Sequence, residues 1–157
     1  MKFKIFQFAT IILLMLVTGV FWGTWFSLSR SMEVFSAAEF IHIGQTIIGN
    51  LAIPMRIIMP SSILFMLLSL WFYPSKRSGG FYLSIIAFTF IIAALLITLL
   101  VEVPIDNQIK EWTPETVPSR WEGIRDRWEF FHALRTFISL CSFGCFSAAL
   151  IFRKTAD

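Results

Sequence analysis

Five side chains with chemical potential recur at spacings of three and four residues near the C-terminal end of the chain: Trp121, Arg125, Trp128, His132 and Arg135. At about 100° per residue, they lie within about 80° of one another on a helix. An imidazole can accept or relay a proton, and a guanidinium can stabilise an oxyanion. We therefore expect one helical stripe, in which the imidazole and the two guanidinium groups are candidate catalytic residues and the two indoles are candidate substrate-binding residues.

Further candidate binding residues lie outside this stripe. Glu102 ends one apolar run and Arg135 opens the next, so both are expected near the outer membrane boundary. An ion pair between them is the first expectation, and the alternative is that each side chain extends separately to water. Asn107 and His42 complete the candidate binding set. Asp106 and Asn107 also suit a simpler role, in which they satisfy backbone groups in a turn.

The aromatic and imidazole groups have alternative interpretations. Trp121 and Trp128 could equally anchor the chain in an aromatic belt at the headgroups, and Trp112 is expected to be such an anchor. His42 and His132 could join a carboxylate in a metal site, but no local spacing motif supports this. Hydrogen-bonded or solvated histidines are far commoner, so we predict neither a metal nor another cofactor.

The composition indicates a membrane protein with one domain, residues 1–157. Hydrophobic residues make up 57% of the chain, charged residues 15%, and the mean hydropathy is +0.75. A helix needs about 20 apolar residues to cross a bilayer. Four runs approach this length and predict spans over residues 5–28, 55–73, 81–101 and 130–152. The first run is too long for a signal peptide and lacks its cleavage pattern, so we expect it to be retained.

The fold class predicted is therefore all-α: a four-transmembrane-helix bundle with an outer amphipathic helix over 36–51 and a polar outer segment over 102–129. Pro60 predicts a kink at the start of the second span. Three prolines predict irregular structure over 103–118. Ser119 and Glu122 have the spacing of a capping box, which predicts that one long helix begins there and continues to Phe152.

The basic residues indicate an orientation. With four spans, both termini and the loop over 74–80 share one side, whose only acid is Asp157. The bases on that side are Lys2, Lys4, Lys76, Arg77, Arg153 and Lys154. Because short loops rich in Lys and Arg stay cytoplasmic, we expect both termini in the cytoplasm of a cell with this protein in its plasma membrane or bacterial inner membrane. The remaining bases fall on the opposite side, so the basic pI does not indicate nucleic acid as a partner.

Small residues recur in the first span as Gly19-xxx-Gly23-xxx-Ser27. This spacing lets helix backbones approach closely, either within the chain or in a homo-oligomer. Cys141 and Cys145 show no redox or zinc pattern and are expected to act as small buried hydrophobes.

Two motifs resemble the anthrone-oxygenase-like family of small four-span membrane proteins. They are Glu102-Val-Pro-Ile-Asp-Asn-Gln-Ile and Arg125-x-x-Trp128-x-x-x-His132-x-x-Arg135-Thr136, supported by residues 35–45 after a Gly-containing first span. Most such proteins have no known function, and named fungal members are linked to oxidation of the activated methylene of anthrones to quinones with oxygen, without a common cofactor. The resemblance implies functional positions at Asn107, Arg125, Trp128, His132 and Arg135. Glu102 stands where the family commonly has Asn, and Asp106 also departs from its pattern, which puts a shared substrate in doubt.

Three functions follow as hypotheses. The chain could be an oxygenase whose outer pocket takes a small hydrophobic or aromatic substrate, with His132 as proton acceptor and Arg125 or Arg135 on the oxyanion. It could instead bind a lipid, quinone or small hydrophobe without catalysis. It could also be a structural subunit with the lipid bilayer as its partner. Clean middle spans argue against solute transport, which usually needs broken or charged helices at mid-membrane.

Overall fold

Four long helical rods lie side by side in the computed structural model, which describes residues 2–152 apart from the side chain of residue 30. The main helices are α1 (Lys2–Ser27), α2 (Ala37–Trp71), α3 (Gly79–Ile97) and α5 (Trp121–Ile151). Each rod is long and apolar enough to cross a membrane. The predicted all-α, four-span architecture is thus confirmed. Arg153, Lys154 and Asp157, which entered the orientation argument, lie outside the described residues.

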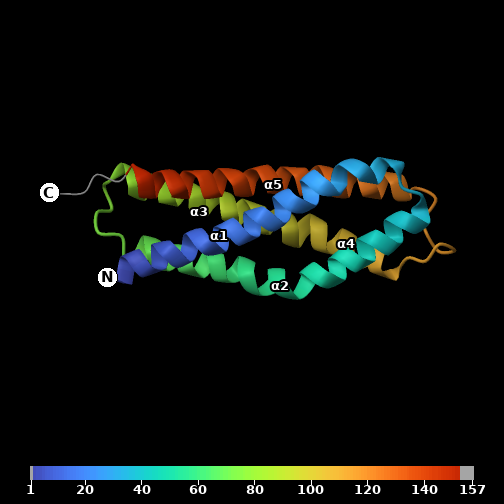
Figure 1. The fold of residues 1–157 in the computed structure, drawn as a ribbon, viewed down its shortest axis with the longest axis horizontal. Coiled ribbons are helices and arrows are strands. Elements are labelled where there is room, and N and C mark those ends of the chain that lie inside the picture. The colour runs from blue at the N-terminus through green and yellow to red at the C-terminus, as the bar shows by residue number, and fades with distance from the viewer. Residues whose placement is uncertain (1, 153–157) are drawn as a thin grey trace.

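The rods are longer than a bilayer requires. α2 has 35 residues, which corresponds to about 52 Å of helix, against about 30 Å of hydrocarbon. α1 begins and α5 ends at one end of the bundle (Figure 1), and we call the opposite end the outer end. Rods of this length pack against one another in two separate apolar cores. One packs Leu14, Met66, Ile91 and Phe146 at mid-bundle, and the second packs Phe40, Ile109 and Trp128 at the outer end.

The separate outer helix predicted over 36–51 is instead the first half of α2. Ser36 and Glu39 form a capping box, in which the Ser36 N–H donates to the Glu39 carboxylate at 2.8 Å. Pro54 and Pro60 lie inside the helix. Proline removes a backbone hydrogen bond and bends a long helix without necessarily ending it. Figure 1 shows α2 bent in the middle of its length, so the prolines mark a bend within one rod.

The first half of α2 is amphipathic, as expected, but it packs on another helix of the bundle. Its buried face is centred on Phe40, Ile41, Gly44 and Ile48. A Cβ at Gly44 would lie 3.3 Å from Ile109, so the glycine permits this close packing. The outer end of α2 is therefore part of the folded core.

The irregular structure predicted over 103–118 is wrong for its first half. α3 continues through a π-helical turn, η2 (Thr98–Glu102), into α4 (Val103–Glu111). The Val103 N–H donates to the carbonyl of Thr98, five residues back, which is the π-helical pattern. Pro104 falls in the first turn of α4, where a proline is tolerated. Between α4 and α5, residues 112–120 form turns and irregular chain.

Local expectations at three other places also change. α5 begins at Trp121 with Arg120 as its N-cap and no side-chain cap hydrogen bond, so the capping box predicted at Ser119 and Glu122 is wrong. Trp112, predicted as an interfacial anchor, is buried in the outer core. Cys141 is exposed on the bundle surface, whereas Cys145 packs against the mid-bundle core.

The small-residue stripe of α1 is open. A Cβ built at Gly19 or Gly23 would meet nothing within 4 Å among the described residues. Both glycines line a groove of about 470 Å³ between α1 and α2, together with Ser27 and Asn50. Close packing within the chain is therefore not their role, and a homo-oligomer through this stripe stays a prediction.

Gly80 offers a test of the helix packing at the inner end. A Cβ there would collide with the Tyr73 hydroxyl and lie 3.1 Å from the Ala149 carbonyl, whereas one at Gly79 would meet nothing within 4 Å. We expect Gly80→Val to destabilise the bundle by about 1–3 kcal/mol, the usual cost of overpacking. Thermal unfolding in detergent, followed by circular dichroism, should show a clearly smaller effect for Gly79→Val. Equal effects would contradict this packing.

Candidate functional site

A buried ion pair joins the third rod to the fourth. Glu102, the last residue of η2, places Oε2 at 2.7 Å from Nη2 of Arg135 on α5. Glu102 has no exposed surface and Arg135 is 8% exposed. The predicted Glu102–Arg135 ion pair is therefore present, and it is more deeply buried than expected at a membrane boundary. Glu102 Oε1 has no hydrogen-bond partner among the described residues.

His132 completes what we call the charge cluster: Glu102, His132 and Arg135. The guanidinium Nη2 lies 2.8 Å and Nε 3.2 Å from His132 Nδ1. A guanidinium only donates hydrogen bonds, so Nδ1 must accept and the imidazole is neutral, with its proton on Nε2. This Nε2–H is buried near the Phe21 carbonyl and makes no hydrogen bond of good geometry. Among the described residues, Glu102 Oε2 is thus held by the ion pair alone, Oε1 has neither an ion pair nor a hydrogen bond, and the imidazole N–H is unsatisfied.

Aromatic rings enclose the charge cluster. The Trp128 ring stacks on the His132 ring at 5.2 Å between centroids, with an angle of 5° between the planes. Phe21 of α1 meets the imidazole edge-on at 6.2 Å, and its face lies 4.6 Å from the Arg135 guanidinium carbon. The Trp128 Nε1–H donates to Asp106 on α4 at 3.0 Å. Three rods therefore fix the two rings that border the imidazole.

The π-helical turn supplies two partners of Arg135. Besides Glu102 at its end, Thr98 at its start accepts a hydrogen bond from Arg135 Nη1 at 3.3 Å. π-helical turns are rare and often occur at functional sites. The irregular turn thus presents its first and last side chains to a single guanidinium on α5.

The other candidates lie apart from this cluster. Trp121 packs against Phe40 in the outer core, and Arg125 stacks over Trp121 while pairing with Asp126 at 2.8 Å. Asn107 is exposed and bonds only Lys110 among the described side chains, and His42 is exposed on α2. The stripe is therefore inward-facing at Trp128, His132 and Arg135, and half-buried nearer the start of α5. Among residues 2–152, no three His, Cys, Asp or Glu side chains are grouped closely enough to hold a metal ion.

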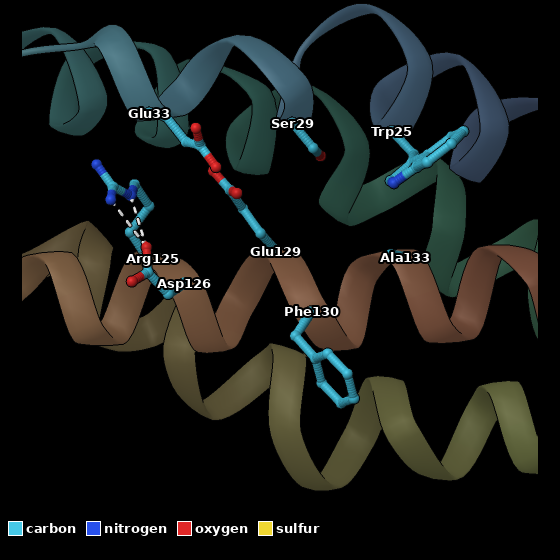
Figure 2. A pocket seen from close by; sticks show the side chains of 8 residues that line it. All are labelled: Trp25, Ser29, Glu33, Arg125, Asp126, Glu129, Phe130 and Ala133. Atoms are coloured by element: carbon cyan, nitrogen blue, oxygen red, sulfur yellow. Dashed lines mark hydrogen bonds and ion pairs between the residues drawn. The ribbon is translucent and has the colours of Figure 1, made fainter.

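A hollow of about 450 Å³ opens beside α5, and we call it the outer hollow. Figure 2 shows its lining: Trp25, Ser29, Glu33, Arg125, Asp126, Glu129, Phe130 and Ala133. Of the predicted site residues, only Arg125 is among them. Neither this hollow nor the α1–α2 groove is lined by a member of the charge cluster. The oxygenase hypothesis places His132 and Arg125 at one pocket, and of the two only Arg125 lines either hollow.

Sequence reasoning missed several contacts of the cluster. Phe21 and Thr98 lie within apolar runs and carry no local signal for a site. The sequence predicts that Asp106 satisfies backbone groups in a turn, whereas it accepts a hydrogen bond from Trp128. Asp106 lies four residues after Glu102, so the two residues share a face where the helix is continuous. A prediction of helix over this segment would therefore have placed Asp106 on the side of α5.

Fold and site together define a class: a four-span helical membrane protein with a neutral histidine and an ion pair enclosed between its last two spans. A comparison with protein-family models matches residues 45–145 to the anthrone oxygenase family. The chain belongs to that family. Searches of curated proteins and of solved structures returned no match.

The ion pair can be tested by a double-mutant cycle. Arg135→Met should cost about 3–5 kcal/mol, because it leaves the Glu102 carboxylate buried without its cation. Adding Glu102→Leu should recover most of that loss, since replacing both members of a buried pair is often neutral. Chemical unfolding of the single and double variants in mixed micelles measures this. Additive losses would show that the two groups do not depend on each other.

Proposed function

We propose that this protein oxidises an apolar aromatic substrate that bears an acidic methylene group, with molecular oxygen as the co-substrate. One observation carries the proposal: an unsatisfied carboxylate oxygen and an unsatisfied imidazole N–H are held together by one arginine, beside the rings of Phe21 and Trp128. Membership of the anthrone oxygenase family supports the substrate class.

The chemistry requires a base and stabilisation of an oxyanion. For an anthrone, loss of a methylene proton gives an enolate, whose negative charge lies largely on oxygen. Electron transfer from the enolate to oxygen and bonding between carbon and oxygen give a peroxide. Protonation and loss of water then leave the quinone. The balance is one anthrone and one oxygen molecule to one anthraquinone and one water.

The geometry favours Glu102 over His132 as the proton acceptor. The lone pair of His132 Nδ1 is already engaged by Arg135, and Nε2 carries a proton. Glu102 Oε1 is free to accept. The Nε2–H of His132 and the Arg135 guanidinium are then the donors for the enolate oxygen, which is the role that buried donors perform best.

Substrate must pass through the bundle wall, because Glu102 has no exposed surface and His132 only 2%. A flat apolar molecule dissolves in the bilayer and would approach laterally. Enclosure then excludes water, which strengthens every charge interaction in the cluster. The π-helical turn is the segment whose rearrangement to a regular helix would move Glu102 relative to Arg135.

Replacement of the proposed base tests this assignment. Glu102→Gln keeps the shape of the side chain but cannot take a proton, so it should lower the oxidation rate by about 10²-fold or more. His132→Asn should also lower the rate, through loss of an oxyanion donor. Oxygen consumption and anthraquinone absorbance, measured with anthrone in proteoliposomes, report the rate after subtraction of empty liposomes.

Glu122→Gln is the matched control, because this carboxylate is exposed in the first turn of α5. It should retain the wild-type rate. An unchanged rate in Glu102→Gln would remove that residue as the base. Rates equal to those of empty liposomes for every form would leave non-catalytic binding of a quinone or lipid, or a structural role, as the function of the cluster.

We further propose that the end of the bundle at which α1 begins and α5 ends faces the cytoplasm. The loop between α2 and α3 lies at that same end (Figure 1), and residues 74–80 contain Lys76 and Arg77 without an acid. Short basic loops are retained on the cytoplasmic side. The charge cluster and the outer hollow would then face the cell exterior or periplasm.

Reporter fusions in a bacterial inner membrane test this orientation. Green fluorescent protein after residue 157 should fluoresce, and alkaline phosphatase inserted in the loop over 112–118 should be active. Fusion of the two reporters at the opposite positions provides the control and should give neither signal. The reverse result would place the charge cluster on the cytoplasmic side.

A further inference from the structure

We propose that the outer hollow is a binding site for a protonated organic amine. This site is separate from the charge cluster and does not depend on the oxidation chemistry. It lies between the end of α1 with the following 3-10 helix, η1 (Ser29–Val34), on one side and α5 on the other. Its volume of about 450 Å³ is within the range of small-molecule sites.

Carboxylates dominate the hollow. Figure 2 shows Glu33 on η1 and Glu129 on α5 pointing toward one another across the gap. The only described guanidinium in the lining, that of Arg125, is engaged by Asp126 through both Nε and Nη2. Neither Glu33 nor Glu129 has an ion-pair partner among the described side chains, and Glu129 Oε1 is buried without a hydrogen bond. Burial raises the pKa of Glu129 to about 7, Arg125 opposes this rise, and the nearby Asp126 and Glu33 carboxylates add to it. A cation between Glu33 and Glu129 would relieve their repulsion.

Ser29 provides an independent indication of a ligand. It is 3% exposed, and its hydroxyl has no hydrogen-bond partner among the described residues. Figure 2 shows this hydroxyl directed from η1 toward α5, between the two glutamates and Trp25. A buried hydroxyl without a partner is costly, and one that lines a hollow is satisfied when a polar ligand occupies it.

The remaining lining favours an organic cation over a metal ion. Trp25 lies at the end of the hollow away from Arg125, so an indole and two carboxylates border the same space (Figure 2). Aromatic faces and carboxylates together recognise ammonium groups that carry an apolar portion. The carboxylates are not grouped closely enough to satisfy a metal ion. An ammonium between Glu33 and Glu129, with its apolar part toward Trp25, uses each of these features.

The position of the hollow along the membrane normal suits two kinds of molecule that carry such an amine. Glu129 lies six residues before Arg135 on α5, or about 9 Å further toward the outer end at 1.5 Å per residue. If the charge cluster is near the hydrocarbon boundary, the hollow is at headgroup level. The amine could therefore belong to a lipid headgroup or to a free lipophilic amine.

Isothermal titration calorimetry of the purified full chain in nonionic detergent at low salt tests the site with phenethylammonium as the probe. We expect saturable one-to-one binding. The Glu33→Gln/Glu129→Gln variant should bind about tenfold more weakly or worse, because it loses charge-assisted hydrogen bonds. The Glu111→Gln/Glu122→Gln variant removes the same charge from exposed positions outside the hollow and should bind as the wild type does.

Several results would overturn the proposal. They are the absence of saturable binding, equal weakening in both double variants, and equally tight binding of the neutral isostere 2-phenylethanol. The hollow would be assigned to a metal instead if calcium bound the wild type but not the Glu33→Gln/Glu129→Gln variant, and no amine bound the wild type. Unfolding temperatures of both variants verify that they are folded.

Nanodiscs distinguish the two sources. The affinity for phenethylammonium is measured in nanodiscs of phosphatidylglycerol with and without phosphatidylethanolamine. If phosphatidylethanolamine weakens the apparent affinity, its headgroup competes for the hollow. Unchanged affinity identifies a free amine. Both results retain the amine assignment, and neither involves the oxidation rate, so the outcome is independent of the proposed function.

Discussion

A carboxylate enclosed in an apolar bundle is tolerated only with a cation beside it, and the Glu102–Arg135 pair meets this constraint. Removing either charge leaves the other without water or a counter-ion. The pair therefore fixes the axial register of α5 against the rod that contains α3. His132 and Thr98 depend on the same guanidinium, so the geometry of the whole cluster follows from where Arg135 is held.

The enclosure of this pair requires structure beyond the membrane spans. Rods of 31 to 35 residues extend past the hydrocarbon, and their outer ends need an apolar core of their own. Phe40, Ile105, Ile109 and Trp128 supply it. Gln45 joins the same region by donating to the carbonyls of Ile109 and Trp112, at 3.0 and 2.9 Å, where α4 ends. This outer core separates the charge cluster from bulk water and makes the cluster chemically distinct from a surface ion pair.

The sequence predicted mainly those features that depend on one segment, together with one ion pair between two of them. Four apolar runs gave the spans, and the spacing of Trp128, His132 and Arg135 gave an inward stripe. Glu102 and Arg135 were matched because each stands at the boundary of an apolar run. The proline-based prediction over 103–118 was wrong at Pro104, because a proline in the first turn of a helix cannot be told from one in a loop by residue type alone. Contacts such as Phe21 with His132 depend on the register between rods, which no single segment encodes.

The charge cluster and the outer hollow lie along the same helices but differ in how charge is compensated. Phe21 borders the cluster on α1, and Trp25, one turn further along α1, borders the hollow. In the cluster, an arginine of the chain itself balances the carboxylate, so the site needs no further charge and suits a neutral apolar substrate. In the hollow, three carboxylates face one described guanidinium, so an external cation would balance the excess negative charge. A site already neutral can admit an uncharged molecule without a large desolvation cost, whereas a site with excess negative charge gains most from a cationic one. The two regions therefore select for different chemistry, and a single ligand is not expected to satisfy both.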